Sequence, residues 1–204
     1  RLITVSLDKR GVSCPARLLD EAAPLTCAAV WDALADGPLS APVFHGKYAR
    51  NEIYTLLPAF AADDPGLENT TVTPLPGDLC WFSFSSVQLG HPAYGYENST
   101  GTGTKGAIVD LALFYGRNNL LINGDQGWVP GNVFGEIIEG LPAMAEACQD
   151  LWMGGVRGET ETQISTWSGF IATGCGSARD GGARRCGGDS RSDLRVVGTE
   201  HGRM

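Results

Sequence analysis

Two stretches of the chain hold most of the side chains that could do chemistry. One runs from 43 to 57 and contains His45 and Glu52. The other runs from 108 to 138, where apolar flanks enclose a polar centre that concentrates Arg117, Asn118, Asn119, Asn123, Asp125, Trp128 and Asn132. We expect a ligand site where these stretches meet. The candidates for a catalytic role there are His45, Glu52 and Arg117.

His45 has a glutamate, Glu52, close by in the sequence. A histidine next to a carboxylate can act as acid and base near neutral pH. The alternative is a histidine that is hydrogen-bonded within the wall of the fold. Because the sequence shows no nucleophile nearby, we favour this structural interpretation.

Arg117 follows Phe114-Tyr115-Gly116, at the end of an expected strand. A guanidinium beside aromatic rings is suited to holding a carboxylate through two parallel hydrogen bonds. The alternative is a surface arginine paired with Asp125 or Glu136. The sequence leaves both interpretations open.

Trp128 precedes a Pro-Gly turn, where its ring can form the wall of a pocket or simply cover the core. Asn118 and Asn119 can bind a ligand amide, although asparagine pairs are more typical of turns. The residues expected at the ligand are Tyr48, Arg50, Tyr54, Tyr115, Arg117, Asn118, Trp128 and Asn132.

Other chemistries lack their motifs. The chain has three histidines, too few to favour a metal site built from His45, His91 and Glu52 or Glu97. The run 101–106 lacks the glycine spacing of a phosphate-binding loop, and no G-x-S-x-G nucleophile motif occurs. We therefore predict neither a metal nor a cofactor.

Composition narrows the class of protein. The chain has 204 residues and 43% hydrophobic content, enough for one domain with a substantial core. A net charge of −8 argues against nucleic acid as a partner. No apolar run reaches the roughly 18 residues that a membrane span needs, so a cytoplasmic location is expected. The cysteines are Cys14, Cys27, Cys80, Cys148, Cys175 and Cys186, whose spacing predicts reduced thiols rather than zinc ligands.

Hydrophobic periodicity predicts the elements that position these residues. Alternation favours a hairpin over 2–18 and strands over 43–48, 51–57, 79–84 and both flanks of the polar centre. Apolar residues three and four apart predict helices over 22–34 and 141–152, and 156–159 reads as the start of a closing strand. The segments 61–76 and 88–105 are expected to be irregular, the second as a mobile loop or lid.

Beyond residue 160 the chain becomes rich in Gly and Arg and loses hydrophobic periodicity. We therefore expect a domain over 1–160 and a weakly structured or non-native tail over 161–204. Hairpins with one early and one late helix indicate a mostly β fold, an antiparallel barrel capped by two short helices. A two-layer α+β fold is the alternative.

Several segments carry a family resemblance over 2–160. They are 19–34, 44–54, Pro76-Gly77-Asp78-Leu79 and Phe114-Tyr115-Gly116-Arg117. This combination resembles a bacterial family of unknown function with a cyclophilin-like fold. The resemblance implies a closed barrel of about eight antiparallel strands with two helices at its ends.

Cyclophilins are prolyl isomerases whose catalytic arginine follows a Phe-His pair. In this sequence Phe44 and His45 are followed by Gly46, so the donor that would ease rotation about the X-Pro bond is missing. The leading expectation is a domain that binds a small anionic or amide-bearing metabolite without isomerase activity. The alternatives are a prolyl isomerase and a structural or interaction module; a homo-oligomer is left open.

Overall fold

The computed structural model describes residues 1–46, 49–85, 107–123, 127–154, 169–173 and 198–199. The chain begins with the predicted hairpin, β1 (Leu2–Leu7) and β2 (Val12–Leu18). A single 3-10 turn, Asp8–Arg10, joins them, and Gly11 follows it with φ 64°, a left-handed conformation that glycine adopts without strain. Ile3, Val5 and Leu7 alternate along β1 and are buried, which confirms the period of two.

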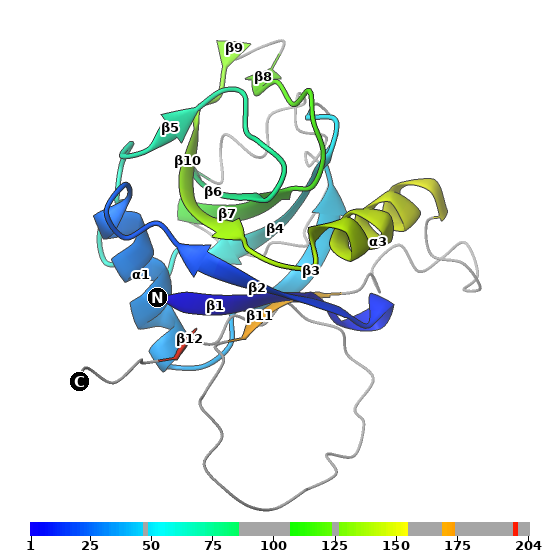
Figure 1. The fold of residues 1–204 in the computed structure, drawn as a ribbon. Helices are drawn as coiled ribbons and strands as arrows, with labels where there is room; N and C mark the ends of the chain where they lie inside the picture. Colours follow the sequence, from blue (N-terminus) through cyan, green and yellow to red (C-terminus); the bar gives the residue numbers. More distant parts are fainter. Residues whose placement is uncertain (47–48, 86–106, 124–126, 155–168, 174–197, 200–204) are drawn as a thin grey trace, which may run out of the picture.

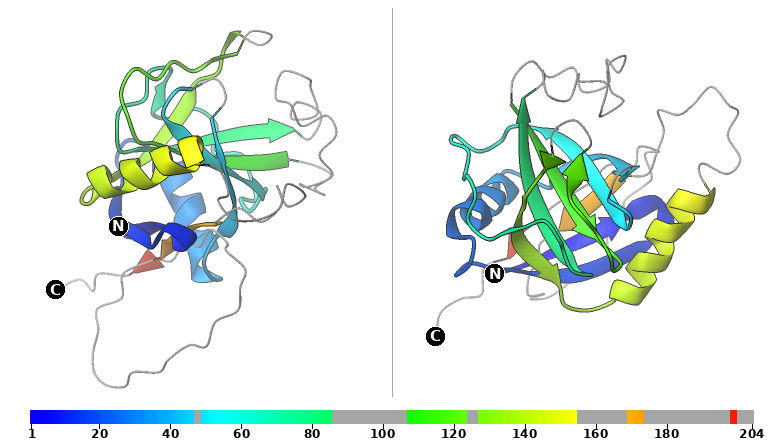
Figure 2. Two further views of the ribbon diagram at one scale, coloured as in Figure 1. Left: turned by 90° about the vertical axis from the view of Figure 1, so that its right-hand side faces the viewer. Right: turned by 90° about the horizontal axis from the view of Figure 1, so that it is seen from above.

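Both predicted helices are present. α1 (Pro24–Ala35) starts with a proline in its first turn, where the missing N–H costs nothing, and it buries Cys27, Val30 and Leu34. α3 (Leu141–Gly154) buries Met144, Cys148 and Leu151 at helical spacing. Figures 1 and 2 show the two helices at opposite ends of the curled sheet.

The main sheet runs in the order β3 (Ser40–His45), β4 (Glu52–Pro58), β7 (Ala107–Phe114), β6 (Asp78–Ser85), β10 (Gly131–Ile137), β2, β1. Every neighbouring pair in this order is antiparallel. The protein is therefore mostly β with two helices, as predicted.

The seven strands curl strongly but leave β1 and β3 unpaired with each other among the strands described within 1–160 (Figure 2). This part is an open half-barrel, so the prediction of a closed barrel from these residues is wrong. The expected closing strand at 156–159 lies outside the described residues. In the segment for which little structure was predicted, β11 (Gly169–Thr173) pairs with β1 and β3, and β12 (Gly198–Thr199) pairs with β1.

The central strands are buried on both faces. On β7, Val109, Leu111 and Leu113 pack with the two helices, whereas Ile108, Ala112 and Phe114 belong to a second apolar cluster on the opposite face. β6 divides in the same way: Leu79 and Trp81 belong to the first cluster, and Cys80, Phe82 and Phe84 to the second. This explains why these strands read as nearly continuous apolar runs.

The remaining described strands are short: β5 (Thr70–Thr71), β8 (Ile122–Asn123) and β9 (Gly127–Trp128), the last two forming a separate hairpin. Cys14, Cys27, Cys80 and Cys148 are buried free thiols, and the other two cysteines lie outside the described residues, as does the expected lid. No helix in the described part is long and apolar enough to cross a membrane.

Candidate functional site

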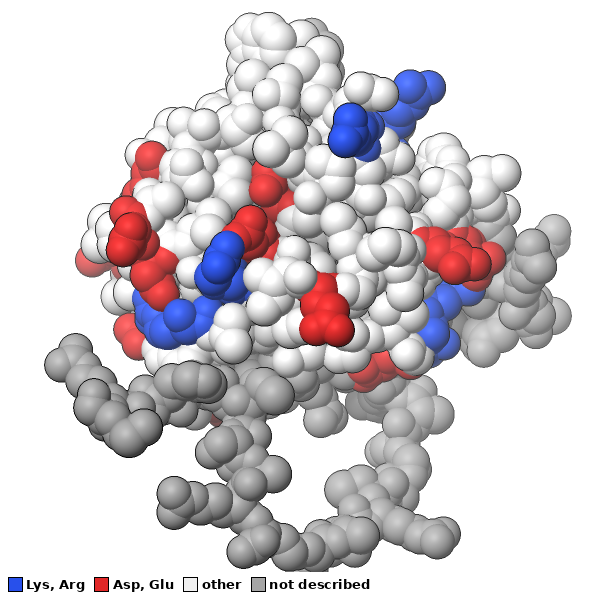
Figure 3. Space-filling model, in the orientation of Figure 1, with Lys and Arg blue, Asp and Glu red and all other residues white. Residues whose placement is uncertain are grey.

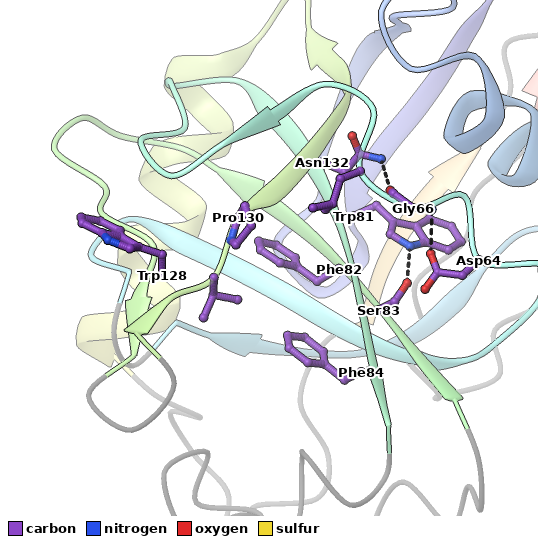
Figure 4. A pocket seen from close by; sticks show the side chains of 11 residues that line it. Asp64, Gly66, Trp81, Phe82, Ser83, Phe84, Trp128, Pro130 and Asn132 are labelled. Carbon is purple, nitrogen blue, oxygen red and sulfur yellow. Dashed lines mark hydrogen bonds between the residues drawn. The ribbon is translucent and has the colours of Figure 1, made fainter.

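A pocket of about 310 Å³ lies beside β6, at the end of the stretch 108–138 (Figure 4). The irregular segment around residues 64–67 borders it, as does the segment 128–132, which runs from the end of β9 to the start of β10. Its lining consists of Asp64, Gly66, Leu67, Trp81, Phe82, Ser83, Phe84, Trp128, Val129, Pro130 and Asn132. Two residues that the sequence predicted at a ligand, Trp128 and Asn132, are among them.

Aromatic rings dominate this lining. Phe82 and Phe84 lie on the same face of β6, with nearly parallel rings whose centroids are 6.1 Å apart. Trp81 is buried, and its indole N–H donates to the Ser83 hydroxyl over 2.8 Å. Trp128 is 59% exposed, so its ring remains available to a ligand. The pocket therefore offers apolar surface that is partly open to solvent.

Asn132 is only 1% exposed, and its amide group is fully engaged. Its oxygen accepts from the backbone N–H groups of Glu68 and Asn69, at 3.1 and 2.8 Å. Its nitrogen donates to the Thr26 hydroxyl and to the Gly66 carbonyl, at 2.7 and 3.1 Å. Asn132 thus positions the pocket loop and has no hydrogen bond to spare for a ligand.

The same loop caps helix α1. The Glu68 carboxylate accepts from the backbone N–H groups of Leu25 and Thr26, at 3.0 and 2.8 Å, and from the Thr26 hydroxyl. Burial alone would raise the pKa of Glu68, but these hydrogen bonds lower it below its ordinary value. The pocket loop and the start of α1 are therefore one hydrogen-bonded unit.

His45 lies away from the pocket, at the end of β3. Its Nε2 is 2.6 Å from the Tyr115 hydroxyl, and its ring lies 4.5 Å from that of Trp152. Burial lowers the pKa of His45, although the hydrogen bond with the Gly46 carbonyl opposes this shift. Burial, and after it the charge of Cys148, raises the pKa of Tyr115 to about 12. The structure thus brings together two predicted site residues, His45 and Tyr115, in a packed contact.

Glu52 does not join His45. His45 pairs with Ile53 across the β3–β4 ladder, so alternation places Glu52 on the opposite face. Burial raises the pKa of Glu52 to about 8. The acid–base pair that the sequence analysis considered, and did not favour, is therefore not assembled, because His45 and Glu52 lie on opposite faces of the sheet.

Arg117 and the β3–β4 turn do meet, but through the backbone. The Asn51 amide donates to the Arg117 carbonyl over 2.7 Å, and the Asn51 N–H donates to the buried Asn119 side chain. Asn118 is a turn residue with φ 65°. The Arg117 side chain is exposed and is not among the described residues of the pocket.

Three other predicted ligand-binding residues are placed elsewhere or lie outside the described part. Arg50 is exposed on the β3–β4 turn, and the Tyr54 ring stacks on Phe44 with centroids 5.6 Å apart. Tyr48 lies outside the described residues. None of these residues lines the described pocket.

Sequence reasoning missed Asp64, Phe82 and Phe84 at the pocket, and Asp110, which pairs with Phe82 across the β6–β7 ladder. Asp110 is 8% exposed, and its Oδ1 has no hydrogen-bond partner in the described part of the chain. Burial, followed by the Glu52 charge, raises its pKa well above the ordinary value. A lone carboxylate inside the apolar run of β7 was the available signal. For the two phenylalanines, the signal was the nearly continuous apolar run of β6, which indicates a strand that is buried on both faces.

A family model described as "Protein of unknown function (DUF3830)" matches residues 5–163. The chain belongs to this family. No curated protein matches it. Among solved structures, the DUF3830 chain is similar to "Structure of McbB in complex with tryptophan", with 19% identity over 74% of this chain and a TM-score of 0.44. The similarity covers 39% of that protein, so this chain spans well under half of its length.

Proposed function

We propose that the DUF3830 domain binds a small organic molecule in the pocket between β6 and the 128–132 segment. The supporting observation is the pocket itself. It has a volume of about 310 Å³, and four aromatic side chains line it, those of Trp81, Phe82, Phe84 and Trp128. Small-molecule sites are typically mostly apolar clefts with a few polar groups, and their volumes begin near this value. Phe82, Phe84 and Trp128 are the proposed contact residues.

The lining bears on the charge of the ligand. The sequence led us to expect an anionic or amide-bearing molecule held by Arg117, but the described lining contains no Lys or Arg and one carboxylate, Asp64. An anion would be repelled there by Asp64 and would gain no ion pair. The geometry therefore favours a ligand that carries hydrogen-bond donors, such as an amide, over an anion.

We further propose that the domain is related to the cyclophilin-like folds, with a sheet that is open within 1–160, and that it lacks prolyl isomerase activity. Gly46 follows Phe44 and His45, and a Cβ at this position would lie 2.9 Å from both the Ala49 carbonyl oxygen and the Glu52 Cβ. These contacts are closer than real side chains tolerate, so an arginine here would require the backbone to shift. Acceleration of cis–trans exchange in a proline peptide by micromolar protein would contradict this proposal.

Binding is tested by screening a library of small amides and aromatic fragments by NMR. The indole N–H signal of Trp128 serves as the reporter. Trp128→Ala should weaken any hit about fivefold or more, because a large aromatic contact is lost. Trp152→Ala is the matched control, since Trp152 is similarly exposed, at 56% against 59%, and lies outside the described pocket lining.

Two results would contradict the proposal. One is a screen in which no fragment at millimolar concentration moves the Trp128 signal. The other is a set of hits that Trp152→Ala weakens as strongly as Trp128→Ala does. Either would favour the alternative of a structural or interaction module.

A further inference from the structure

Two side chains that could donate hydrogen bonds in the described pocket lining, Asn132 and Trp81, are already engaged. The Asn132 amide donates to Thr26 and Gly66, and the Trp81 indole donates to Ser83. Asp64 uses one carboxylate oxygen to accept from the Gly66 N–H over 2.9 Å, which leaves its other oxygen as an acceptor at an exposed position. The charged group that faces a ligand is therefore a carboxylate.

The aromatic rings reinforce this preference. The face of an aromatic ring is the negative end of its quadrupole and attracts cations within about 6 Å of the ring centre. Phe82, Phe84 and Trp128 are all lining residues of this cavity. Figure 4 shows the two phenylalanines near each other on β6 and Trp128 at the edge of the group, on the side away from Asp64. Several rings beside one carboxylate are a suitable environment for an ammonium group on an apolar body.

The charge of the surroundings agrees. No Lys or Arg is present among the described lining residues, and the whole chain carries a net charge of −8. Figure 3 shows several acidic side chains on the α1 side of the molecule, with a smaller number of basic side chains among them. Glu68 and Asn132 connect the pocket loop to this helix. A cation approaching the pocket thus meets a favourable field, whereas an anion does not.

We infer that the pocket is selective for organic cations, and that a small alkylammonium group is held between the aromatic rings and the Asp64 carboxylate. This inference rests on the proposed function and specifies its ligand class. Trp128 and the two phenylalanines contribute the ring faces, and Asp64 contributes the counter-charge. Asn132 and Glu68 act as positioning residues that hold the loop carrying Asp64.

Three probes of one shape separate charge from shape. They are choline, its neutral isostere 3,3-dimethylbutan-1-ol, which has a tert-butyl group in place of the trimethylammonium, and the anion 3,3-dimethylbutanoate. Titrations of the full chain should show choline binding about tenfold more tightly than the neutral isostere, with the anion weakest. Added salt should weaken choline binding selectively, since a partly exposed charge pair is screened.

Two substitutions assign the charge effect. Asp64→Asn should bring choline to within about twofold of the neutral isostere without changing binding of the isostere. Asp63→Asn is the matched control, because it removes a neighbouring exposed carboxylate that is not among the described lining residues. Trp128→Ala should weaken both probes.

The outcomes distinguish the cation preference from small-molecule binding in general. Equal or tighter binding of the neutral isostere overturns the cation preference and leaves small-molecule binding intact. Loss of choline binding in Asp63→Asn but not in Asp64→Asn also overturns it. If no probe binds, the cation preference is overturned, and the fragment screen decides separately whether the pocket binds any small molecule.

Discussion

Asp110 is a buried carboxyl group in the middle of the sheet. It lies between Leu56 and Phe82 in the β4–β7–β6 ladder, and one of its oxygens has no hydrogen-bond partner among the described residues. A buried charge without a partner is costly, so the folded protein favours the neutral acid. Its pKa is accordingly raised by burial and, secondarily, by Glu52.

The raised pKa of Asp110 makes the stability of the fold depend on pH. A carboxyl group whose pKa is higher in the folded state than in the unfolded state stabilises the fold below its ordinary pKa. That contribution is lost as the pH rises through the folded value. Glu52, with a pKa raised by burial to about 8, acts in the same direction.

Asp110→Asn should therefore flatten the decline of unfolding free energy between pH 4 and pH 8. The asparagine side chain is neutral at every pH. At pH 8 we therefore expect the unfolding free energy of the variant, relative to that of wild type, to be about 1 to 3 kcal/mol higher than the same difference at pH 4. Urea unfolding at several pH values measures this slope. Glu146→Gln, at an exposed position of α3, is the control and should leave it unchanged. An unaltered slope in Asp110→Asn would mean that Asp110 ionises in the fold at little cost.

At the scale of elements, the pocket loop and α1 depend on each other through Glu68. The residue before α1, Ala23, has no side chain able to cap the helix, and the Glu68 carboxylate takes that role from a distant loop. A capping side chain is worth about 0.5–2 kcal/mol. The start of the helix and the shape of the pocket should therefore be lost together.

Glu68→Gln tests this coupling. Because the folded pKa of Glu68 is lowered, its stabilising contribution is present above the unfolded pKa and is lost as the pH falls through the folded value. The variant should lose about 0.5–1 kcal/mol of unfolding free energy at pH 7, and the difference should shrink in acid. Glu21→Gln, an exposed acidic residue before the same helix, is the control. A difference that persists unchanged in acid would argue that the carboxylate charge is not involved.

Across the whole molecule, local sequence patterns predicted the strands and helices but not how the two edges of the sheet are paired. Two patterns were sufficient to predict their elements, because each element has one buried face. They are the alternation of Ile3, Val5 and Leu7 and the helical spacing of Cys27, Val30 and Leu34. The pairing of β11 with both β1 and β3 was missed, because short strands in a Gly-rich segment leave little hydrophobic signal.

The candidate site was predicted less completely, for a similar reason. Trp128 and Asn132 line the pocket, as the polar stretch suggested. The companions expected from the 43–57 stretch do not line the described pocket, because a strand's faces alternate and register decides which residues meet. His45 and Glu52 are close in sequence and still point to opposite faces of the sheet.

The position of β11 makes a prediction for the whole sheet. Without that strand, β1 and β3 would be edges with exposed N–H groups, which is a recognised route to association. Ile171→Pro should disrupt the β11 pairing, because proline cannot donate to a ladder and fits poorly between two strands. Alternate amides of β1, from Thr4 to Leu7, should then exchange with deuterium about tenfold faster or more.

Amides of β7 supply the internal control, because β4 and β6 flank that strand on both sides. Ile171→Val, which keeps the backbone donor and a β-branched side chain, should behave like wild type. Sedimentation velocity should detect self-association of the proline variant if the freed edges pair between molecules. Unchanged exchange in β1 would mean that β11 contributes nothing to the sheet, and that the half-barrel of the family domain is stable with both of its edges open.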